Sequence, residues 1–189
     1  MSSNIITGDV CRPSHSILLD NFFRRMFQKP RKIVGEYIQN GDTVIDLGCG
    51  PGFFSIDMAE MAGSRGKLYA VDLQNEMLDK VKKKAEAKGL THRICFHKCP
   101  QDSIGLDEHV KADFILAYYM VHEVPDSRQL LNEIRGLLKK DGRLLIVEPT
   151  FHVSKKKFIK MLKEVEDIGF SIIDTPPKKG GRSLLLSAA

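Results

Sequence analysis

Short apolar runs recur along this chain and alternate with stretches in which apolar residues return every three or four positions. The short runs are rich in β-branched and aliphatic residues, and several are apolar at nearly every position, which is typical of strands covered on both faces. We therefore expect seven strands, at residues 43–47, 67–73, 93–98, 112–118, 143–148, 170–175 and 183–187.

The longer stretches carry the helical spacing of apolar residues. One apolar stripe runs from Met77 to Ala85 and is followed by Gly89, a residue type that commonly ends helices. Asp126 precedes another stripe and is placed to cap it, and Gln129, three residues later, predicts a capping box. The expected helices cover residues 14–28, 30–39, 53–61, 77–85, 130–138 and 158–165, the last of them stopped by Gly169.

The alternation of strands and helices predicts parallel strands joined by right-handed crossovers, with helices on both faces of the sheet. Only residues 176–182 separate the last two strands. That stretch is too short for a helical crossover, so these two strands should pair as an antiparallel hairpin. The pattern predicts an α/β fold with a doubly wound, seven-stranded, mostly parallel sheet and an antiparallel last strand. In such sheets ligands bind beyond the carboxyl ends of the strands.

Composition places the chain among ordinary globular proteins. It has 189 residues, 42% hydrophobic and 28% charged, with a formal net charge of +5. We expect one domain over residues 1–189, with N-terminal helices in 1–40 as a candidate substrate lid and an α/β core in 41–189. No apolar run reaches the ~18 residues of a membrane span, and the polar N-terminus lacks a secretory pattern, so a cytoplasmic location is expected.

The four cysteines do not predict a cross-linked or metal-binding protein. Their positions are Cys11, Cys49, Cys95 and Cys99. They form neither a disulfide framework nor the paired spacing of a structural zinc site. Reduced thiols and no metal are therefore expected.

Three alternating glycines follow the first expected strand. The segment runs Asp46, Leu47, Gly48, Cys49, Gly50, Pro51, Gly52 and leads into a helical pattern. Glycines in a strand-to-helix turn let the backbone bend sharply and let a ligand approach closely. The amides at the start of the new helix favour an anionic group such as a carboxylate.

A dinucleotide site is the first alternative for this loop. Its fingerprint needs a glycine three residues after the second one, but Phe53 and Ser55 stand at the two positions that would satisfy the spacing. Asp72 ends the second strand, about 20 residues beyond the loop, where an acid can accept hydrogen bonds from ribose hydroxyls. No basic residue lies directly beside it to pair with a 2′-phosphate. The pattern favours a ribose-bearing ligand that ends in a small carboxylate.

These segments resemble a known family. VIDLGCGPG followed by AVDLQNEML is similar to the cofactor-binding half of class I S-adenosylmethionine-dependent methyltransferases. The segments MVHEVPD and LLKKDGRLLIVEP, with the closing hairpin, resemble the type 11, ubiquinone/menaquinone methyltransferase-like branch. The resemblance runs from about Arg31 to the C-terminus. It implies a Rossmann-like, seven-stranded sheet, S-adenosyl-L-methionine as cofactor, and transfer of its methyl group to an acceptor.

The resemblance also implies roles for individual residues. The glycine loop and Asp46 would hold the methionine end, Asp72 the ribose, and Leu73 and Met77 the adenine. An acid that often follows the third strand is replaced here by Pro100, so its role would pass to Gln101 or Asp102. With Tyr118, from the end of the fourth strand, the expected cofactor residues are Asp46, Gly48, Cys49, Gly50, Gly52, Asp72, Leu73, Met77, Gln101, Asp102 and Tyr118.

Candidate catalytic residues follow the fourth and fifth strands. His122 is the first choice for a general base because histidine exchanges a proton near neutral pH. Glu123 and Glu148 are the second choices, and His152 follows the same strand end as Glu148. Structural roles stay open for all of them: His122 or Glu123 could cap local backbone, and Glu148 could be an interior structural acid.

The sequence leaves the acceptor open. A small molecule is the expected acceptor, since no appended RNA-binding module fits in this length. An RNA or protein methyltransferase is the alternative within the class: the positive charge permits nucleic acid, but residues 117–120 lack the Asn/Asp-Pro-Pro-aromatic motif of amino-directed nucleic-acid enzymes. A cofactor-binding subunit without catalysis and a nicotinamide-dependent oxidoreductase are the remaining alternatives. Nothing in the sequence determines the oligomeric state.

Overall fold

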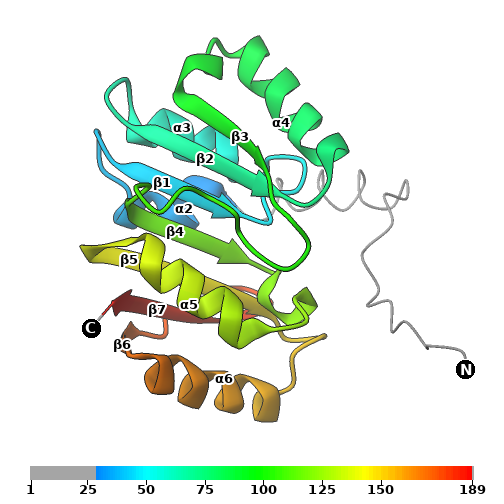
Figure 1. Cartoon of the computed structure of the whole chain (residues 1–189), viewed down its shortest axis with the longest axis vertical. Helices are drawn as coiled ribbons and strands as arrows, with labels where there is room; N and C mark the ends of the chain where they lie inside the picture. The colour runs from blue at the N-terminus through cyan, green and yellow to red at the C-terminus, as the bar shows by residue number, and fades with distance from the viewer. Residues whose placement is uncertain (1–28, 189) are drawn as a thin grey trace, which may run out of the picture.

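The computed structural model describes residues 29–188 and shows a central sheet flanked by helices (Figure 1). The strands are β1 (Thr43–Leu47), β2 (Lys67–Asp72), β3 (Ile94–Lys98), β4 (Ala112–Tyr118), β5 (Leu138–Pro149), β6 (Phe170–Asp174) and β7 (Gly181–Ala188). The α-helices are α2 (Pro30–Val34), α3 (Ser55–Ala62), α4 (Asn75–Ala87), α5 (Ser127–Leu137) and α6 (Lys155–Ile168). Three 3₁₀ turns complete it: η1 (Gly35–Tyr37), η2 (Thr91–Arg93) and η3 (Val121–Glu123).

The seven strands lie in the order β3-β2-β1-β4-β5-β7-β6. Strands β1 to β5 pair in parallel, and β7 runs antiparallel to both of its neighbours, β5 and β6. The prediction of a mostly parallel sheet with one reversed last strand is confirmed. The chain builds outward from β1 to β3 and then returns to place β4 on the other side of β1. The carboxyl ends of β1 and β4 therefore flank the point where the winding direction reverses.

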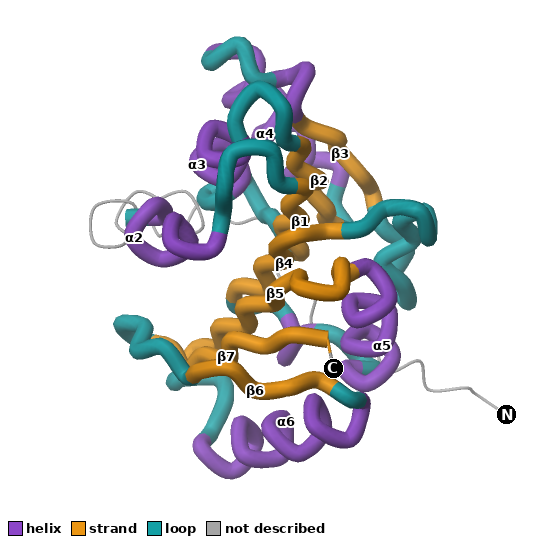
Figure 2. Tube along the Cα trace, turned by 90° about the vertical axis from the view of Figure 1, so that its left-hand side faces the viewer, coloured by secondary structure: helices purple, strands orange, loops and turns teal. Residues whose placement is uncertain are grey.

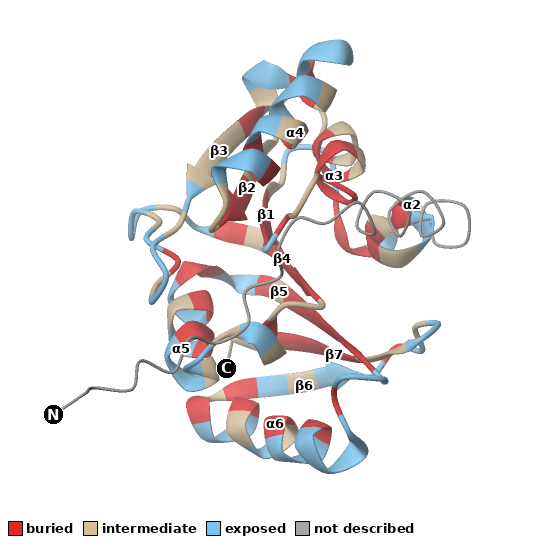
Figure 3. Cartoon of the chain, turned by 90° about the vertical axis from the view of Figure 1, so that its right-hand side faces the viewer, coloured by how far each residue is buried: buried red, intermediate tan, exposed pale blue. Residues whose placement is uncertain are grey.

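Helices cover both faces of the sheet (Figure 2). Alternate strand residues separate into two hydrophobic clusters: Val44 packs on the side of α3 and α4, whereas Ile45 packs on the side of α5 and α6. Buried positions follow the strands and the inner sides of the helices, and exposed positions lie on the outer sides (Figure 3). The near-continuous apolar runs in the sequence arise from this double coverage.

Most element boundaries lie within a few residues of the prediction, and two differ more. The helix expected over residues 30–39 ends at Val34 and continues only as a 3₁₀ turn, because Ile38 is already extended with φ −116°. Leu138, expected in the helical stripe, instead begins β5 by pairing with Ala112. An irregularity in the pairing then separates this contact from the main β4–β5 ladder that resumes at Arg143. The helix expected over residues 14–28, with the proposed lid, lies outside the described residues.

Two predicted helix ends are confirmed, one of them in part. Gly169 ends α6 in the left-handed conformation with φ 95°, which glycine adopts without steric cost. Asp126 caps α5 by accepting the backbone N–H of Gln129 at 2.9 Å. The reciprocal half of the capping box is absent, since the Gln129 side chain donates to the carbonyl of Asp102 at 2.8 Å.

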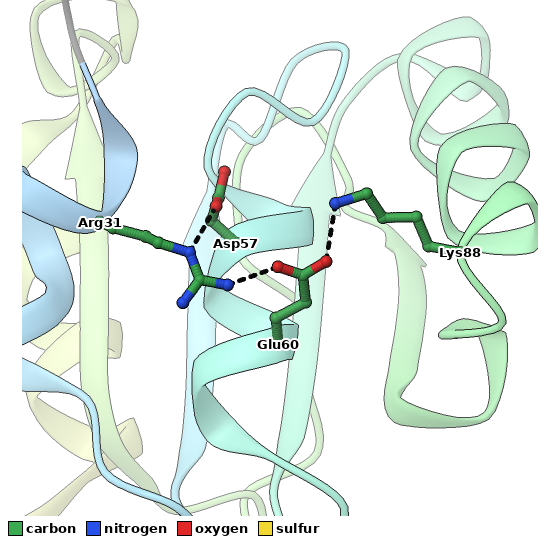
Figure 4. Close-up of polar contacts among 4 residues, drawn as sticks. All are labelled: Arg31, Asp57, Glu60 and Lys88. Atoms are coloured by element: carbon green, nitrogen blue, oxygen red, sulfur yellow. Dashed lines mark hydrogen bonds and ion pairs between the residues drawn. The ribbon is translucent and has the colours of Figure 1, made fainter.

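An ion-pair network fastens α2 and α4 to α3 (Figure 4). Arg31 bonds Asp57 at 3.1 Å and also pairs with Glu60, which accepts Lys88 Nζ at 2.7 Å. The hydrogen bond from Lys88, together with Arg31, lowers the pKa of Glu60. Arg31 and Lys88 are about half exposed, so each pair contributes under about 1 kcal/mol. No helix among the described residues has the length and apolar character needed to cross a bilayer.

A buried polar pair joins β1 to α3 directly behind the glycine loop. The Asp46 carboxylate accepts a hydrogen bond from Ser55 Oγ at 2.6 Å, and both residues are almost completely buried. Burial raises the pKa of Asp46 to about 7, although the Ser55 bond works in the opposite direction. The group therefore keeps its proton in the folded state at pH values where the unfolded chain has lost it.

The Asp46 pKa predicts a specific pH dependence of stability. Between the unfolded pKa of about 3.9 and the folded value the native state binds more protons, so the free energy of unfolding should fall as pH rises. Asp46→Asn removes this titration. Urea unfolding measures the free energy of unfolding of the variant and of wild type at each pH. The difference between the two should shift in favour of the variant by roughly 2–4 kcal/mol between pH 4 and pH 7. Asp79→Asn, an exposed acid on α4, is the control and should show no such gain. A pH-independent difference for Asp46→Asn would contradict the assignment.

Candidate active site

A cavity of about 830 Å³ lies beyond the carboxyl ends of the parallel strands. This volume is in the range of pockets that hold cofactor-sized ligands. Its wall is formed by the glycine loop (residues 48–52), the ends of β2, β4 and β5, the β3–β4 loop (residues 99–111), and the first turns of α5. The cavity lies where the strand order reverses, which is the expected ligand position in open α/β sheets.

The three glycines of the loop have distinct surroundings. All have positive φ: 62° at Gly48, 51° at Gly50 and 76° at Gly52. A Cβ at Gly48 would meet Met120 at 2.9 Å, and one at Gly52 would meet Val81 at 3.0 Å. A Cβ at Gly50 would meet nothing within 4 Å, and Gly50 lies on the cavity wall. Gly50 is therefore the position where a side chain would project into ligand space.

Asp72 connects the two loops that follow β1 and β2. Its carboxylate accepts the backbone N–H of Gly50 at 2.8 Å and that of Gln74 at 2.9 Å, one on each oxygen. Burial raises the pKa of Asp72, and these backbone hydrogen bonds act against that rise. Each oxygen keeps a further lone pair, because a carboxylate has about four acceptor sites. The group lies on the cavity wall and can accept two hydroxyl hydrogen bonds.

Apolar and polar groups line the cavity next to Asp72. Leu73, Met77, Gln101 and Asp102 all lie on the wall. The β3–β4 loop that carries Gln101 and Asp102 is held from α5. Gln129 donates to the Asp102 carbonyl, and the Glu133 carboxylate accepts the backbone N–H of Ile104 at 2.6 Å. These bonds fix the loop that covers one end of the cavity.

Four of the expected site residues lie behind the wall. Asp46 and Cys49 are buried, Gly52 packs against α4, and Glu148 is completely buried beneath His122. None of these residues is part of the cavity lining. These four residues therefore lie behind the residues that form the wall.

A histidine–carboxylate pair lies at the end of β4. His122 on η3 bonds Glu148 through Nδ1, and Glu148 also accepts the backbone N–H of Val121 at 3.1 Å. Burial raises the pKa of Glu148 to about 7, against the effect of the backbone amides of His122 and Val121. Burial lowers the pKa of His122, so its ring is mainly neutral at neutral pH. The ring lies on the cavity wall, and its second nitrogen, Nε2, faces His152 and Glu123.

Glu123 and His152 lie on the other side of the His122 ring. A Glu123 carboxylate oxygen is 4.0 Å from His122 Nε2, and the Glu123 side chain is 46% exposed. His152 Nδ1 is 3.4 Å from the same nitrogen. Both residues line the cavity.

Aromatic rings surround this end of the cavity. Tyr118, expected near the cofactor, packs against Tyr119 in a tilted arrangement with ring centroids 4.4 Å apart, and both line the wall. Tyr119 has a φ of 60°, unusual for a residue with a side chain. Phe151 lies 6.5 Å from Tyr119 in an edge-to-face arrangement and is 74% exposed. These rings provide flat apolar surfaces beside a polar dyad.

The charge of the wall differs in sign from that of the chain. Its acidic residues are Asp72, Asp102, Glu123, Asp126 and Glu133, and the described part of the wall contains no Lys or Arg. The formal charge of the whole sequence is +5. The cavity therefore favours a cationic or neutral ligand over a polyanion.

Sequence reasoning missed several of these groups. The anchoring of the β3–β4 loop by Gln129 and Glu133 depends on side chains meeting across 27 and 29 residues. His152 contacts His122 because the ends of β4 and β5 lie side by side. The spacing of residues along the sequence does not indicate this contact. A large apolar residue shortly after a predicted strand end was a usable signal for Phe151.

Comparisons with known proteins agree with this geometry. A family described as a methyltransferase domain matches residues 38–175. The demethylmenaquinone methyltransferase of Lactobacillus johnsonii is 31% identical over 134 residues, covering 70% of this chain and 52% of that protein. The ubiquinone/menaquinone biosynthesis C-methyltransferase UbiE of Francisella philomiragia is 28% identical over 139 residues, covering 74% and 53%. The chain spans about half the length of these curated relatives.

A solved structure shares the whole architecture. The crystal structure of a SAM-dependent methyltransferase from Aquifex aeolicus superposes with a TM-score of 0.81 at 25% identity, covering 94% of this chain and 99% of that chain. The glycine loop, the strand-end acid and the strand order occur here together with these matches. The chain belongs to the methyltransferase-domain family and has the architecture of class I S-adenosyl-L-methionine-dependent methyltransferases.

Proposed function

We propose that this enzyme transfers a methyl group from S-adenosyl-L-methionine to a small, uncharged or cationic acceptor that carries an exchangeable proton. The observation that carries the proposal is that one cavity joins Asp72 and Gly50 to His122 and the aromatic rings around it. Cofactor groups and acceptor groups thus share one continuous wall. Alignment of two reactants in such a site can contribute about 7–11 kcal/mol to lowering the barrier.

The residues present fit the cofactor. Asp72 offers acceptor sites for ribose hydroxyls, and the bare backbone at Gly50 leaves space for the methionine end. Leu73 and Met77 offer apolar surface for the adenine, and Gln101, Asp102 and Tyr118 lie near enough on the same wall to contact it. The acidic wall suits a ligand with a positive sulfonium. When bound, the cofactor supplies a methyl group that is already activated for displacement.

The chain's own contribution to chemistry would be positioning and proton removal. Glu148 holds His122 through Nδ1, which leaves Nε2 as the basic nitrogen. This tautomer and orientation are the ones that a histidine base needs. Glu123 would raise the basicity of the ring from its exposed side, since its charge raises the pKa of His122. Glu148 acts through His122 and does not itself reach the cavity.

The acceptor would be small and partly aromatic. Relatives are named for quinone precursors, and Tyr118, Tyr119 and Phe151 offer stacking surfaces beside His122. The carboxylates of the wall disfavour an RNA acceptor, whose phosphates they would repel. Transfer of the labelled methyl group should be tested with hydroquinones, catechols, aromatic amines, peptides and RNA. Transfer to RNA with none to small molecules would overturn the proposal, and a complete lack of transfer with intact cofactor binding would favour a non-catalytic subunit.

Asp72→Ala should weaken binding of S-adenosyl-L-methionine. A charged hydrogen bond contributes about 1.5–3 kcal/mol, which corresponds to a roughly 10- to 150-fold rise in Kd by calorimetry. Asp79→Ala removes an acid from the exposed side of α4 and serves as the matched control with unchanged affinity. An unchanged Kd for Asp72→Ala would remove this residue from the site.

Gly50→Val should abolish cofactor binding while the chain stays folded. The substituted side chain would project into the cavity from a backbone with φ 51°, at a conformational cost of about 1–2 kcal/mol. Gly136→Ala, a helical glycine with open space around it, is the control and should raise stability by about 0.5–1 kcal/mol without affecting binding. Circular dichroism and calorimetry measure the two effects; cofactor bound by Gly50→Val with normal affinity would contradict the geometry.

The pH profile of methyl transfer should report His122. Only the neutral ring accepts a proton, and its pKa is lowered by burial, so the rate should rise with pH through a midpoint below 6.5 and then level off. His122→Ala should lower kcat by about 10²- to 10⁴-fold and abolish this step. Glu148→Gln should also lower kcat, because the amide would face His122 Nδ1 as a donor and place the ring proton on Nε2. A His122→Ala profile identical to that of wild type would exclude the base.

A further inference from the structure

His122 and His152 form a contact that the proposed methyl transfer has not yet used. Their ring centroids lie 5.5 Å apart at an angle of 71°, and His122 Nε2 is 3.4 Å from His152 Nδ1. A ring nitrogen of neutral histidine either donates or accepts, so this pair is favourable when one carries the proton and the other the lone pair. The Phe151 ring packs against His152 with centroids 4.6 Å apart and orients it.

Glu148, His122 and His152 form a line from the interior to the surface. Glu148 is completely buried, the His122 side chain is 18% exposed, and His152 is exposed. An acceptor seated in the cavity would cover the accessible part of His122. A proton collected on His122 would then be held beside the buried Glu148 carboxylate, without a direct path to water.

Methyl transfer to a protic acceptor always releases one proton. The bond between sulfur and the methyl carbon breaks with its electron pair going to sulfur, a bond forms between the methyl carbon and the acceptor atom, and the acceptor loses its hydrogen as a proton. The cationic sulfonium becomes a neutral thioether, so the charge balances only when that proton leaves the site. Repeated turnover therefore requires a path for it.

We propose that His152 is the proton exit of this site, a role that rests on the proposed function. The acceptor proton passes to His122 Nε2, whose imidazolium faces the Glu148 carboxylate. The N–H bond at Nε2 then breaks, its electron pair stays on His122, and the proton moves to Nδ1 of His152. The His152 imidazolium releases its Nε2 proton to water, and exchange with water then moves the remaining proton from Nδ1 back to Nε2, which restores the Nδ1 lone pair. His122 returns to its neutral form for the next turnover.

The charges that face His122 agree with this direction. Burial has the largest effect and lowers the pKa of His122. Glu123 on η3 raises this pKa, whereas His152 in the loop after β5 and Lys157 on α6 lower it. Glu148 on β5 holds the opposite nitrogen. A positive charge arriving at the buried ring is thus driven outward by burial, and the exposed ring of His152 is the nearest nitrogen that can receive it.

Histidine NMR tests the contact without any acceptor. His152→Asn removes the interaction by which His152 lowers the pKa of His122, so that pKa should rise and the balance of His122 tautomers should change; the His122 signals are assigned from His122→Ala. His109→Asn, which changes an exposed histidine of the β3–β4 loop outside the cavity lining, is the control and should leave His122 unchanged. A His122 titration in His152→Asn identical to that of wild type would overturn the proposal. So would micromolar zinc binding that removes both titrations, which would identify a metal-binding pair.

Kinetics separates proton exit from acceptor binding. With the panel acceptor that reacts fastest, His152→Asn and His152→Gln should lower kcat by about 10-fold, leave KM unchanged, and recover on addition of imidazole, as expected for a missing proton carrier. A raised KM with unchanged kcat would overturn the proposal and make His152 part of the acceptor wall. The NMR result does not depend on methyl transfer, so it distinguishes failure of the exit from failure of the proposed function.

Discussion

The active site depends on one constraint, the parallel alignment of β1, β2, β4 and β5. Parallel strands end at the same edge of the sheet, so four segments that are distant in sequence open onto one cavity. The return of the chain across β1 leaves a gap between the loops on either side. Because both faces of the sheet are covered by helices, this edge is the place where polar groups can meet a ligand without disrupting the core.

Within that edge, the carboxylate of Asp72 shapes the part of the cavity that is proposed to hold the cofactor. It bonds the amide of Gly50 in one loop and that of Gln74 in the next, and so holds two backbone segments around the same space. The three glycines with positive φ in this loop have two different structural roles. Gly48 and Gly52 allow close packing against Met120 and Val81, whereas Gly50 keeps the cavity open.

The sequence predicted the fold in detail because local and global signals agreed. Alternating apolar runs, the glycine loop and the short final connection were each enough to assign an element, and the alternation predicted parallel pairing. The order of the strands in the sheet was not predicted from the sequence. Boundaries failed where tertiary pairing overrode helical periodicity, as at Leu138, which pairs with Ala112 instead of extending α5. In the site, residues at strand ends could be selected from the sequence. Their depth could not, since Asp46 and Glu148 look like wall residues by position and are buried behind the wall.

The buried acids Asp46 and Glu148 hold neighbouring groups in place but do not line the cavity themselves. Both have a pKa raised to about 7 by burial, and each is hydrogen-bonded to one side chain: Asp46 to Ser55 at the start of α3, and Glu148 to His122 after β4. A buried carboxylate whose charge is only partly compensated by hydrogen bonds lowers the stability of the fold. Such a group is tolerated where it holds another side chain or a backbone segment in place. Asp46 fixes the segment from which the glycine loop departs, and Glu148 fixes the orientation of a ring. In both cases the interior acid holds its neighbour in place, but only His122 lines the cavity, whereas Ser55 is itself completely buried.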